Sequence, residues 1–260
     1  MTISLHQPFL DNQDLKLLKN AFQSNWISSG GNYTNKFENL LKKKLNSKNL
    51  TCLINGTSSL QISLKIAGVK TGDEVIVPTT TFVATINSII YNSAKPLFFD
   101  IDDYFNLDEE KVIDFLTKHT FTKNRNVYNK FTKNKISAII IVHTFGNACF
   151  FENLYNFCKD KNIKIIEDAA ESLGTYYKTG KFKKKYTGTI GFAGCLSFNG
   201  NKIVTSGGGG AIISKNKNII KKVNHLITQA KTDPINFIHD QVGYNMKISN
   251  LHSSIGYSQL

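Results

Sequence analysis

The stretch SFNGNKIVTSGGGGAI, residues 197–212, holds a lysine in surroundings that a surface lysine does not need. Lys202 lies between a polar turn at 199–201 and the apolar pair 203–204, and four glycines follow. A side-chain amine in such a place can serve as a nucleophile or a base. It can also be a surface lysine whose stem lies along apolar neighbours. The stretch alone leaves both interpretations open.

A carboxylate and a candidate anion site accompany this lysine. Asp168 ends the apolar run 163–167, where a carboxylate needs a cationic partner or a role as a helix cap. Gly56, Thr57 and Ser58 stand at the expected start of a helix. Backbone N–H groups and hydroxyls there can bind a phosphate, although Thr or Ser caps are also common.

Together these residue types fit pyridoxal 5'-phosphate. This cofactor needs a lysine for covalent attachment, a carboxylate for the ring nitrogen and donors for the phosphate. An aromatic ring can pack on its face. In this chain the lysine is Lys202, the carboxylate is Asp168, the phosphate donors are Thr57 and Ser58, and the aromatic ring is Phe82, each at a loop end. Taken singly, Phe82 fits a core residue at least as well.

Other chemistries have less support. The glycine run 207–210 is neither a dinucleotide fingerprint nor a P-loop, and by itself it suits a flexible hairpin. The four cysteines form no CxxC pair, so neither a zinc site nor a disulfide framework is expected. The formal net charge of +13 favours a nucleic-acid partner, but Arg125 is the only arginine and no aromatic platform accompanies the lysines. We therefore expect no metal and no nucleic acid.

Hydropathy places the chain among globular proteins. Its 260 residues are 41% hydrophobic, and no stretch approaches the roughly 18 apolar residues of a membrane helix. Residues 1–6 lack a basic region followed by an apolar core. We therefore expect a cytoplasmic protein with no membrane partner.

Alternating helices and strands must position the candidate residues. Apolar periodicity predicts helices over 11–24, 35–45, 57–67, 82–91, 108–116 and 151–160. Strand-like runs occupy 50–54, 73–78, 96–102, 136–143 and 163–168. This order predicts an α/β fold with a mainly parallel central sheet covered by helices, and ligands of such sheets bind beyond the carboxyl ends of the strands. The polar, lysine-rich segment 117–134 is interpreted as an extended surface loop.

Four segments carry a family resemblance: NGTSSLQISLKIAGVKTGDEVIVPTTTFVATINSI, IIEDAAESLGT, SFNGNKIVTSGGGGAI and VGYNMKISNLHSSIGYSQL. They resemble the DegT/DnrJ family of sugar aminotransferases, which are fold-type-I enzymes that use pyridoxal phosphate. The similarity runs from about Trp26 to the last residue. Together with TQAKTDPINFIHD, these motifs look most like the branch that acts on UDP-4-keto-6-deoxy-HexNAc sugars in legionaminic-acid and bacillosamine-type pathways.

The resemblance implies a role for each cofactor residue. Lys202 is similar to the lysine that holds the cofactor covalently, and Asp168 to the aspartate that pairs with the pyridine nitrogen. Phe82 matches the aromatic that stacks on the ring. The positions matched to phosphate binding are Thr57, Ser58 and Ser197, with Gly56 in the same turn. Glu171 occupies a position near the cofactor that varies between branches.

The resemblance also implies partners. Asn245 is similar to the asparagine that reaches the phosphate of a neighbouring subunit, so a homodimer is expected. Ser28, Ser29 and Gly30 match a loop near the substrate entrance. Relatives usually have Arg where this chain has Lys247, which removes a bidentate donor. Residues 1–260 are expected to form the cofactor-binding large domain with its N-terminal helices, without the small C-terminal domain of the family.

The implied reaction moves an amino group from a donor, expected to be glutamate, to C4 of a nucleotide sugar. One alternative within the fold is a sugar dehydratase, whose relatives replace the lysine with histidine; Lys202 argues against it. A second alternative is an inactive remnant that still binds the cofactor or a nucleotide sugar, since the expected small domain is missing.

Overall fold

The computed structural model describes residues 6–233 and 235–260, so residues 1–5, considered above for a secretory leader, lie outside the described part. The chain divides into two compact units. The first comprises residues 1–59 and 196–260, and the second comprises residues 60–195. The chain passes between them within one helix and one strand, and each unit is described by itself.

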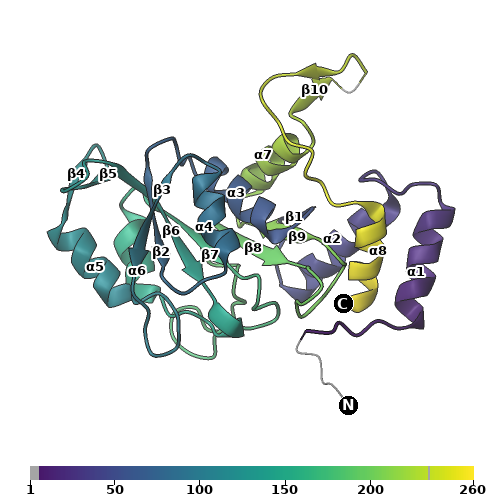
Figure 1. Cartoon of the computed structure of the whole chain (residues 1–260), viewed down its shortest axis with the longest axis horizontal. Helices are drawn as coiled ribbons and strands as arrows, with labels where there is room; N and C mark the ends of the chain where they lie inside the picture. Colours follow the sequence, from purple (N-terminus) through teal and green to yellow (C-terminus); the bar gives the residue numbers. More distant parts are fainter. Residues whose placement is uncertain (1–5, 234) are drawn as a thin grey trace. The chain divides into compact units, whose positions relative to one another are not determined.

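The second unit is built on a parallel sheet (Figure 1). Its strand order is β8-β7-β6-β2-β3, and each neighbouring pair is parallel. The bounds are β2 (Glu74–Pro78), β3 (Lys95–Phe99), β6 (Lys135–Val142), β7 (Lys164–Asp168) and β8 (Ala193–Ser197). The continuous apolar run of β6 is buried over seven of its eight positions, as expected for a strand covered on both faces. The predicted α/β class with a mainly parallel sheet is thus confirmed.

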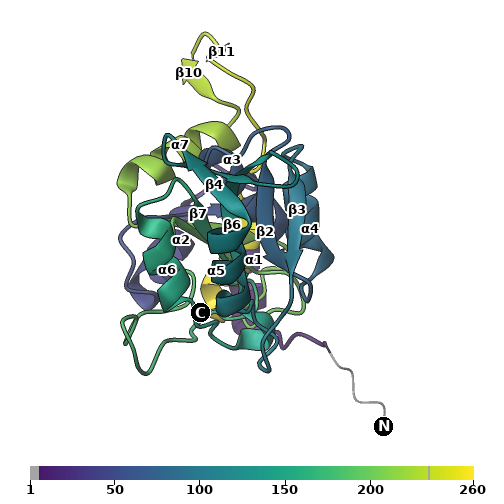
Figure 2. The ribbon, with the colours of Figure 1, turned by 90° about the vertical axis from the view of Figure 1, so that its left-hand side faces the viewer.

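Helices lie on both faces of this sheet (Figure 2). Their bounds are α3 (Gly56–Ile66, which begins in the first unit), α4 (Val83–Ile90), α5 (Glu109–Lys118) and α6 (Glu152–Lys159). Val112 of α5 and Leu154 of α6 pack in one core cluster with Ile165 of β7. Because side chains alternate along a strand, Glu167 lies on that face, while Asp168 lies on the face that α4 covers.

The segment 117–134 corrects one prediction. Instead of an extended surface loop it forms a hairpin, β4 (Thr120–Lys123) and β5 (Asn126–Asn129), and β5 pairs antiparallel with β6. Asn124 and Arg125 at its tip both have positive φ, as two-residue hairpin turns require. Val127 is buried, whereas the other side of the hairpin carries Phe121 stacked on Tyr128, with Phe121 40% exposed. A short, one-sided edge strand carries too few apolar residues to be recognised by hydropathy.

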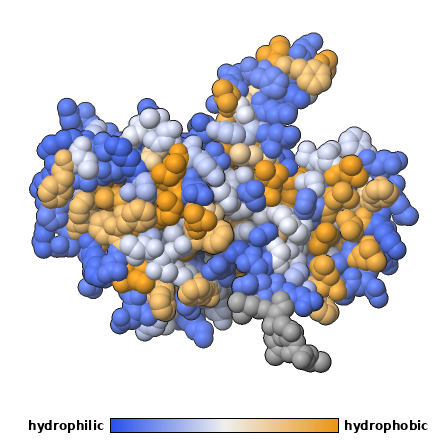
Figure 3. Space-filling view, in the orientation of Figure 1, coloured by the Kyte–Doolittle hydropathy of each residue, from blue (hydrophilic) through white to orange (hydrophobic). Residues whose placement is uncertain are grey.

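The first unit gathers the two ends of the described chain (Figure 1). Its elements are α1 (Asn12–Gln23), α2 (Asn32–Lys44), β1 (Leu50–Leu53), β9 (Gly210–Ile213), α7 (Lys217–Ile227), β10 (Lys231–Asp233), β11 (Ile238–His239) and α8 (Asn250–Gln259). Helix α8 packs against α1 and α2, and β1 pairs antiparallel with β9. β10 and β11 form a projecting hairpin whose exposed apolar side chains include Phe237 and Ile238. Figure 3 shows hydrophobic surface at this hairpin.

The predicted helices agree with the structure to within three residues. Asp11 caps α1 by accepting the N–H groups of Gln13 and Asp14, which is the acidic start that the pattern indicated. The largest difference is at α2, which begins at Asn32 instead of residue 35. Over the described residues, no helix has both the length and the apolar character that a membrane crossing requires.

Candidate active site

Asp168 ends β7 in the second unit and is 7% exposed. Its Oδ2 accepts a hydrogen bond from the Thr85 hydroxyl at 2.7 Å, and Thr85 accepts one from the Thr81 hydroxyl at 2.8 Å. Its Oδ1 accepts the N–H of Ala170 at 3.2 Å. No helix begins at residue 169, so the helix-cap interpretation of Asp168 is wrong. A buried carboxylate oriented by side chains from α4 is suited to bind a cation or a protonated ring nitrogen.

Phe82 immediately precedes α4, one turn before Thr85, and is 71% exposed. A phenyl ring so exposed does not pack in the core, so the core interpretation of this residue is wrong. The ring therefore offers a flat apolar face beside the helix that orients Asp168, within the same unit. Its role in stacking stays a prediction.

Glu167, next to Asp168, is fully buried on the opposite face. It accepts hydrogen bonds from His143 Nε2 at 3.1 Å and from the backbone N–H groups of Gly188, Ile190 and Gly191 at 2.7–2.9 Å. Burial raises the pKa of this carboxyl, but the hydrogen bonds from His143 and from the backbone outweigh it, and the pKa lies below its ordinary value. Glu167 therefore holds the loop at residues 188–191, just before β8, through the backbone N–H groups of that loop.

His143 has a defined tautomer in this contact. Its Nδ1 accepts the N–H of Cys149 at 3.1 Å, so in the neutral ring the proton lies on Nε2 and is donated to Glu167. Glu171, which the resemblance implies to lie near the cofactor, is half-buried and accepts the N–H of Phe145 at 3.1 Å. The His143–Glu167 and Phe145–Glu171 hydrogen bonds join the carboxyl ends of β6 and β7 and the loops that follow them.

In the first unit, the start of α3 meets the end of β8. The helix cap is Asn55, whose side chain accepts the N–H of Ser58 at 2.7 Å, so the interpretation of Thr57 or Ser58 as the cap is wrong. A Cβ on Gly56 would lie 2.9 Å from the Cβ of Ser197. Only glycine allows this approach, which brings the Ser197 hydroxyl against the first turn of α3. Backbone N–H groups of a first helical turn lack partners within the helix and attract anions.

Lys202 is half-buried in the loop between β8 and β9, and its backbone N–H donates to Asn199 at 3.0 Å. The glycine run that follows is not a flexible hairpin. A Cβ on Gly210 would lie 2.5 Å from the backbone of Asn55, and Gly209 has φ +147. The glycines therefore allow β9 to pack closely against the turn that leads into α3.

The remaining predicted residues lie elsewhere in the first unit. Ser28, Ser29 and Gly30 are exposed in the loop between α1 and α2, and the Ser28 carbonyl accepts the N–H of Asn250 at 2.8 Å. Asn245 is exposed and forms an isolated bridge with Thr228.

Lys247, the position where the resemblance implies an Arg in relatives, has an internal role. It donates to Glu38 at 2.6 Å and to Thr51 at 2.7 Å. The side chains of Lys247 and Glu38 are only 14% and 11% exposed, so this ion pair lies within the first unit.

The structure thus forms one group of candidate residues in each unit. Gly56, Thr57, Ser58 and Ser197 meet in the first, and Asp168 meets the α4 segment in the second. Sequence reasoning missed Thr85, Glu167 and His143. Consecutive carboxylates at a buried strand end could have indicated that each face of β7 needs its own partners, because side chains alternate along a strand.

Comparisons with known proteins agree on one family. The sequence profile described as "DegT/DnrJ/EryC1/StrS aminotransferase family" matches residues 8–260. GDP-perosamine synthase of Escherichia coli O157:H7 is 35% identical, over 99% of this chain and 65% of its own length. UDP-4-amino-4,6-dideoxy-N-acetyl-beta-L-altrosamine transaminase of Campylobacter jejuni serotype O:2 is 32% identical, over 96% and 62%.

Solved structures show the same fold. The putative sugar aminotransferase Spr1654 from Streptococcus pneumoniae, in its PMP form, superimposes with a TM-score of 0.85 at 23% identity, over 100% of this chain and 65% of that one. The chain spans about two thirds of the length of the curated relatives it matches, 65% of the first. The match over residues 8–260, with these relatives, means that the chain belongs to the DegT/DnrJ/EryC1/StrS aminotransferase family.

Proposed function

We propose that the protein transfers an amino group, with glutamate as donor, to C4 of a UDP-4-keto-6-deoxy-HexNAc nucleotide sugar. The observation that carries this proposal is the buried Asp168 carboxylate, oriented by Thr85 at the end of β7, in a chain of this aminotransferase family. The UDP-sugar transaminase of Campylobacter jejuni, at 32% identity, supports the class of sugar.

Pyridoxal 5'-phosphate is the cofactor of this family, and Spr1654 was also solved in a PLP form. The residues present fit it. Ser197 packed on Gly56 supplies a hydroxyl beside helix N–H groups for the phosphate, and Asp168 supplies a buried carboxylate for the ring nitrogen. Lys202 supplies an amine in a half-buried loop. The assignment of these residues to one cofactor comes from the resemblance of their motifs to the family.

When bound, pyridoxal phosphate supplies an electron-accepting ring and a carbon that carries an amino group from one substrate to the next. Asp168 then keeps a proton on the ring nitrogen, because an adjacent anion favours the charged form. Thr85 holds Oδ2 in place by its hydroxyl hydrogen bond. The Lys202 amine takes and returns the proton at the reacting carbon. Phe82 would supply the aromatic face that packs on the ring.

GDP-linked sugars are the second candidate substrate class. The relative at 35% identity is GDP-perosamine synthase, and a second GDP-perosamine synthase, from Vibrio cholerae, is also 35% identical. A direct comparison separates the two classes: the UDP-linked and the GDP-linked 4-keto-6-deoxy sugars are each offered with glutamate. Faster conversion of the GDP-linked sugar would replace the UDP proposal and leave the aminotransferase proposal intact.

A homodimer is part of the proposal. Asn245 is exposed, and the resemblance assigns it to the phosphate of a neighbouring subunit. If so, each phosphate site needs two copies of the chain. Sedimentation of Asn245→Ala and of the unchanged protein, with and without pyridoxal phosphate, tests this: a monomer that holds stoichiometric cofactor contradicts the shared site.

The assignment of Lys202 is tested with borohydride and peptide mapping. We expect the reduced pyridoxyl label on Lys202, and Lys202→Ala should lose the label while some cofactor still binds through phosphate contacts. Lys217→Ala, at the exposed start of α7, is the matched control and should keep the label on Lys202. Label on another lysine contradicts the assignment. In a separate sample that is loaded with cofactor but not reduced, an absorbance that glutamate leaves unchanged favours the inactive remnant.

A further inference from the structure

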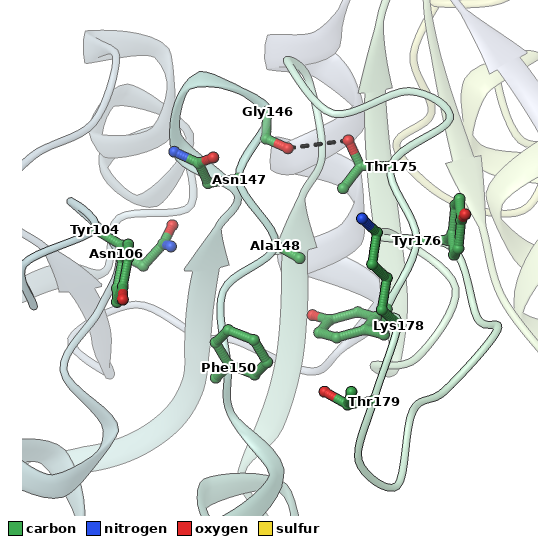
Figure 4. Close-up of a pocket in the computed structure, with 11 residues that line it drawn as sticks. Tyr104, Asn106, Gly146, Asn147, Ala148, Phe150, Thr175, Tyr176, Lys178 and Thr179 are labelled. Carbon is green, nitrogen blue, oxygen red and sulfur yellow. Dashed lines mark hydrogen bonds between the residues drawn. The ribbon is translucent and has the colours of Figure 1, made fainter.

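A pocket of about 310 Å³ opens within the second unit, where β3, β6 and β7 lead into loops. Figure 4 shows its walls. Tyr104 and Asn106 follow β3, Asn147 and Phe150 follow β6, and the segment 175–179 follows β7. These are carboxyl ends of parallel strands, the edge at which ligands of such sheets bind. The volume lies at the lower end of the roughly 300–1,000 Å³ typical of small-molecule sites.

The pocket lies on the face of β7 opposite to Asp168. Tyr177, one of its lining residues, belongs to the core cluster that contains Ile139 and Ile165 on the Glu167 side. None of the cofactor residues named above lines it. The pocket therefore shares no lining residue with the candidate cofactor residues, although Glu171 contacts the segment next to Gly146.

Hydrogen bonds fix the walls in place. The Thr175 hydroxyl donates to the Gly146 carbonyl at 2.9 Å, which joins the segments after β6 and β7. The buried Tyr177 hydroxyl donates to the Cys149 carbonyl at 2.7 Å, and its ring packs edge-on against Phe150. A pocket whose walls are already tied loses little entropy when a ligand binds.

Asn106 gives the pocket a side-chain amide donor. The residue is 1% exposed, and its Oδ1 accepts the N–H of Thr144 at 3.2 Å. Within residues 6–233 and 235–260, its Nδ2 makes no hydrogen bond. Figure 4 shows the amide directed towards the pocket. This amide nitrogen therefore borders the hollow and can donate to an acceptor atom on a ligand.

Aromatic rings and a cation complete the lining. Tyr104, Phe150 and Tyr176 are 67%, 57% and 51% exposed, so their rings are accessible to a ligand at this hollow. Lys178 adds an ammonium group, and no carboxylate lines the pocket to repel an anion. Aromatic faces stack on nucleobases, a carbonyl oxygen suits an amide donor, and an ammonium pairs with phosphate.

We propose that this pocket binds a nucleoside phosphate. A base carbonyl accepts from Asn106 Nδ2, the base stacks on Tyr104, and the phosphate pairs with Lys178. The ligand is either a free nucleotide or the nucleotide portion of a sugar nucleotide, and only in the second case does the site rest on the proposed function.

Isothermal titration of the full chain with UMP and GMP, without pyridoxal phosphate, tests the proposal. We expect saturable binding with Kd below about 1 mM for at least one of them. Tyr104→Ala should weaken it about tenfold through lost stacking. Lys178→Gln should weaken UMP or GMP binding while leaving the binding of the matching nucleoside unchanged. Ala148→Leu, which places bulk beside Phe150 in the pocket, should abolish binding.

Matched controls lie outside the pocket. Tyr91→Ala removes an exposed ring beyond α4, and Lys159→Gln removes an exposed lysine of α6; both should bind as the unchanged chain does. Circular dichroism confirms that each variant folds. Asn106→Asp keeps the oxygen that accepts from Thr144 but removes the donor, and should also weaken binding.

Competition with a UDP- or GDP-linked sugar identifies the source of the ligand. If the sugar nucleotide displaces the bound UMP or GMP, and this displacement is absent in Ala148→Leu, the pocket is assigned to sugar nucleotides. If UMP or GMP binds but the sugar nucleotide does not displace it, the pocket is assigned to free nucleotides. Either result supports the site. The proposal is overturned if neither nucleotide binds, if inorganic phosphate binds as tightly, or if Ala148→Leu and Tyr104→Ala bind like the controls.

Discussion

Glu167 and Asp168 are consecutive carboxylates at the end of one strand, yet they differ in burial and in hydrogen-bond partners because they lie on opposite faces of β7. Glu167 faces the α5 and α6 side, has no exposure, and is held by four donors, three of them backbone N–H groups. Asp168 faces α4, is slightly exposed, and is oriented by a threonine hydroxyl and one backbone N–H. Partners, not residue type, separate a structural carboxylate from one placed to meet a ligand.

The sharpest way to break this comparison is Glu167→Ala. Four buried donors would lose their acceptor, and we expect the free energy of unfolding to fall by about 3 kcal/mol or more. Urea unfolding of the chain measures it. Asp168→Ala serves as the control and should cost clearly less stability. Equal losses at the two positions would show that the faces of β7 do not differ in this way.

Asp168→Asn tests the other half of the comparison. The amide keeps an oxygen for the Thr85 hydroxyl but carries no charge to hold a proton on the ring nitrogen. We expect the half-reaction with glutamate to slow by about two orders of magnitude, with a smaller loss of pyridoxal phosphate affinity and stability nearly unchanged. Single-turnover absorbance measures the rate. A variant with a near-normal rate would make Asp168 structural, like its neighbour.

Thr85→Val tests whether the Thr85 hydroxyl orients Asp168. The substitution removes the hydroxyl but keeps the size of the side chain. We expect stability to fall by about 1 kcal/mol and pyridoxal phosphate to bind several-fold more weakly. Thr85→Ser should restore both. Ser88→Ala, which removes a hydroxyl bonded to the Thr85 carbonyl on the same helix, is the control. If that variant impairs cofactor binding as much, the effect comes from α4 packing.

The smallest expected effect is a pH dependence of stability through Glu167. Its pKa lies below the ordinary value of 4.5: burial raises it, but the His143 hydrogen bond and the backbone N–H groups lower it further. A lowered pKa in the folded state gives stability that is present above the unfolded pKa and lost as the pH falls below it. The urea concentration at the unfolding midpoint should therefore decrease as the pH is lowered from about 5 to the lowered pKa of Glu167. In Glu167→Gln this dependence of the midpoint on pH should be weaker. An unchanged dependence would assign the acid sensitivity to other carboxylates.

Local patterning was sufficient for most of the framework. Apolar periodicity and capping residues predicted α1, α4, α5 and α6, and the continuous apolar run of β6 indicated a doubly covered strand. The hairpin β4–β5 was missed because an edge strand buries only one side. The cap interpretation of Asp168 failed because the chain after β7 turns instead of forming a helix.

By itself the sequence determined the alternation of strands and helices and the candidate residues at their ends, since hydrophobic period and turn chemistry are encoded locally. The tertiary structure alone decided which partners those residues meet. Thr85 reaches Asp168 across 83 positions, and His143 reaches Glu167 across 24. Asn106 borders the pocket only because the loops after β3, β6 and β7 converge. Such contacts depend on strand order and register, which bring distant segments to the same edge of a sheet and which no local pattern encodes.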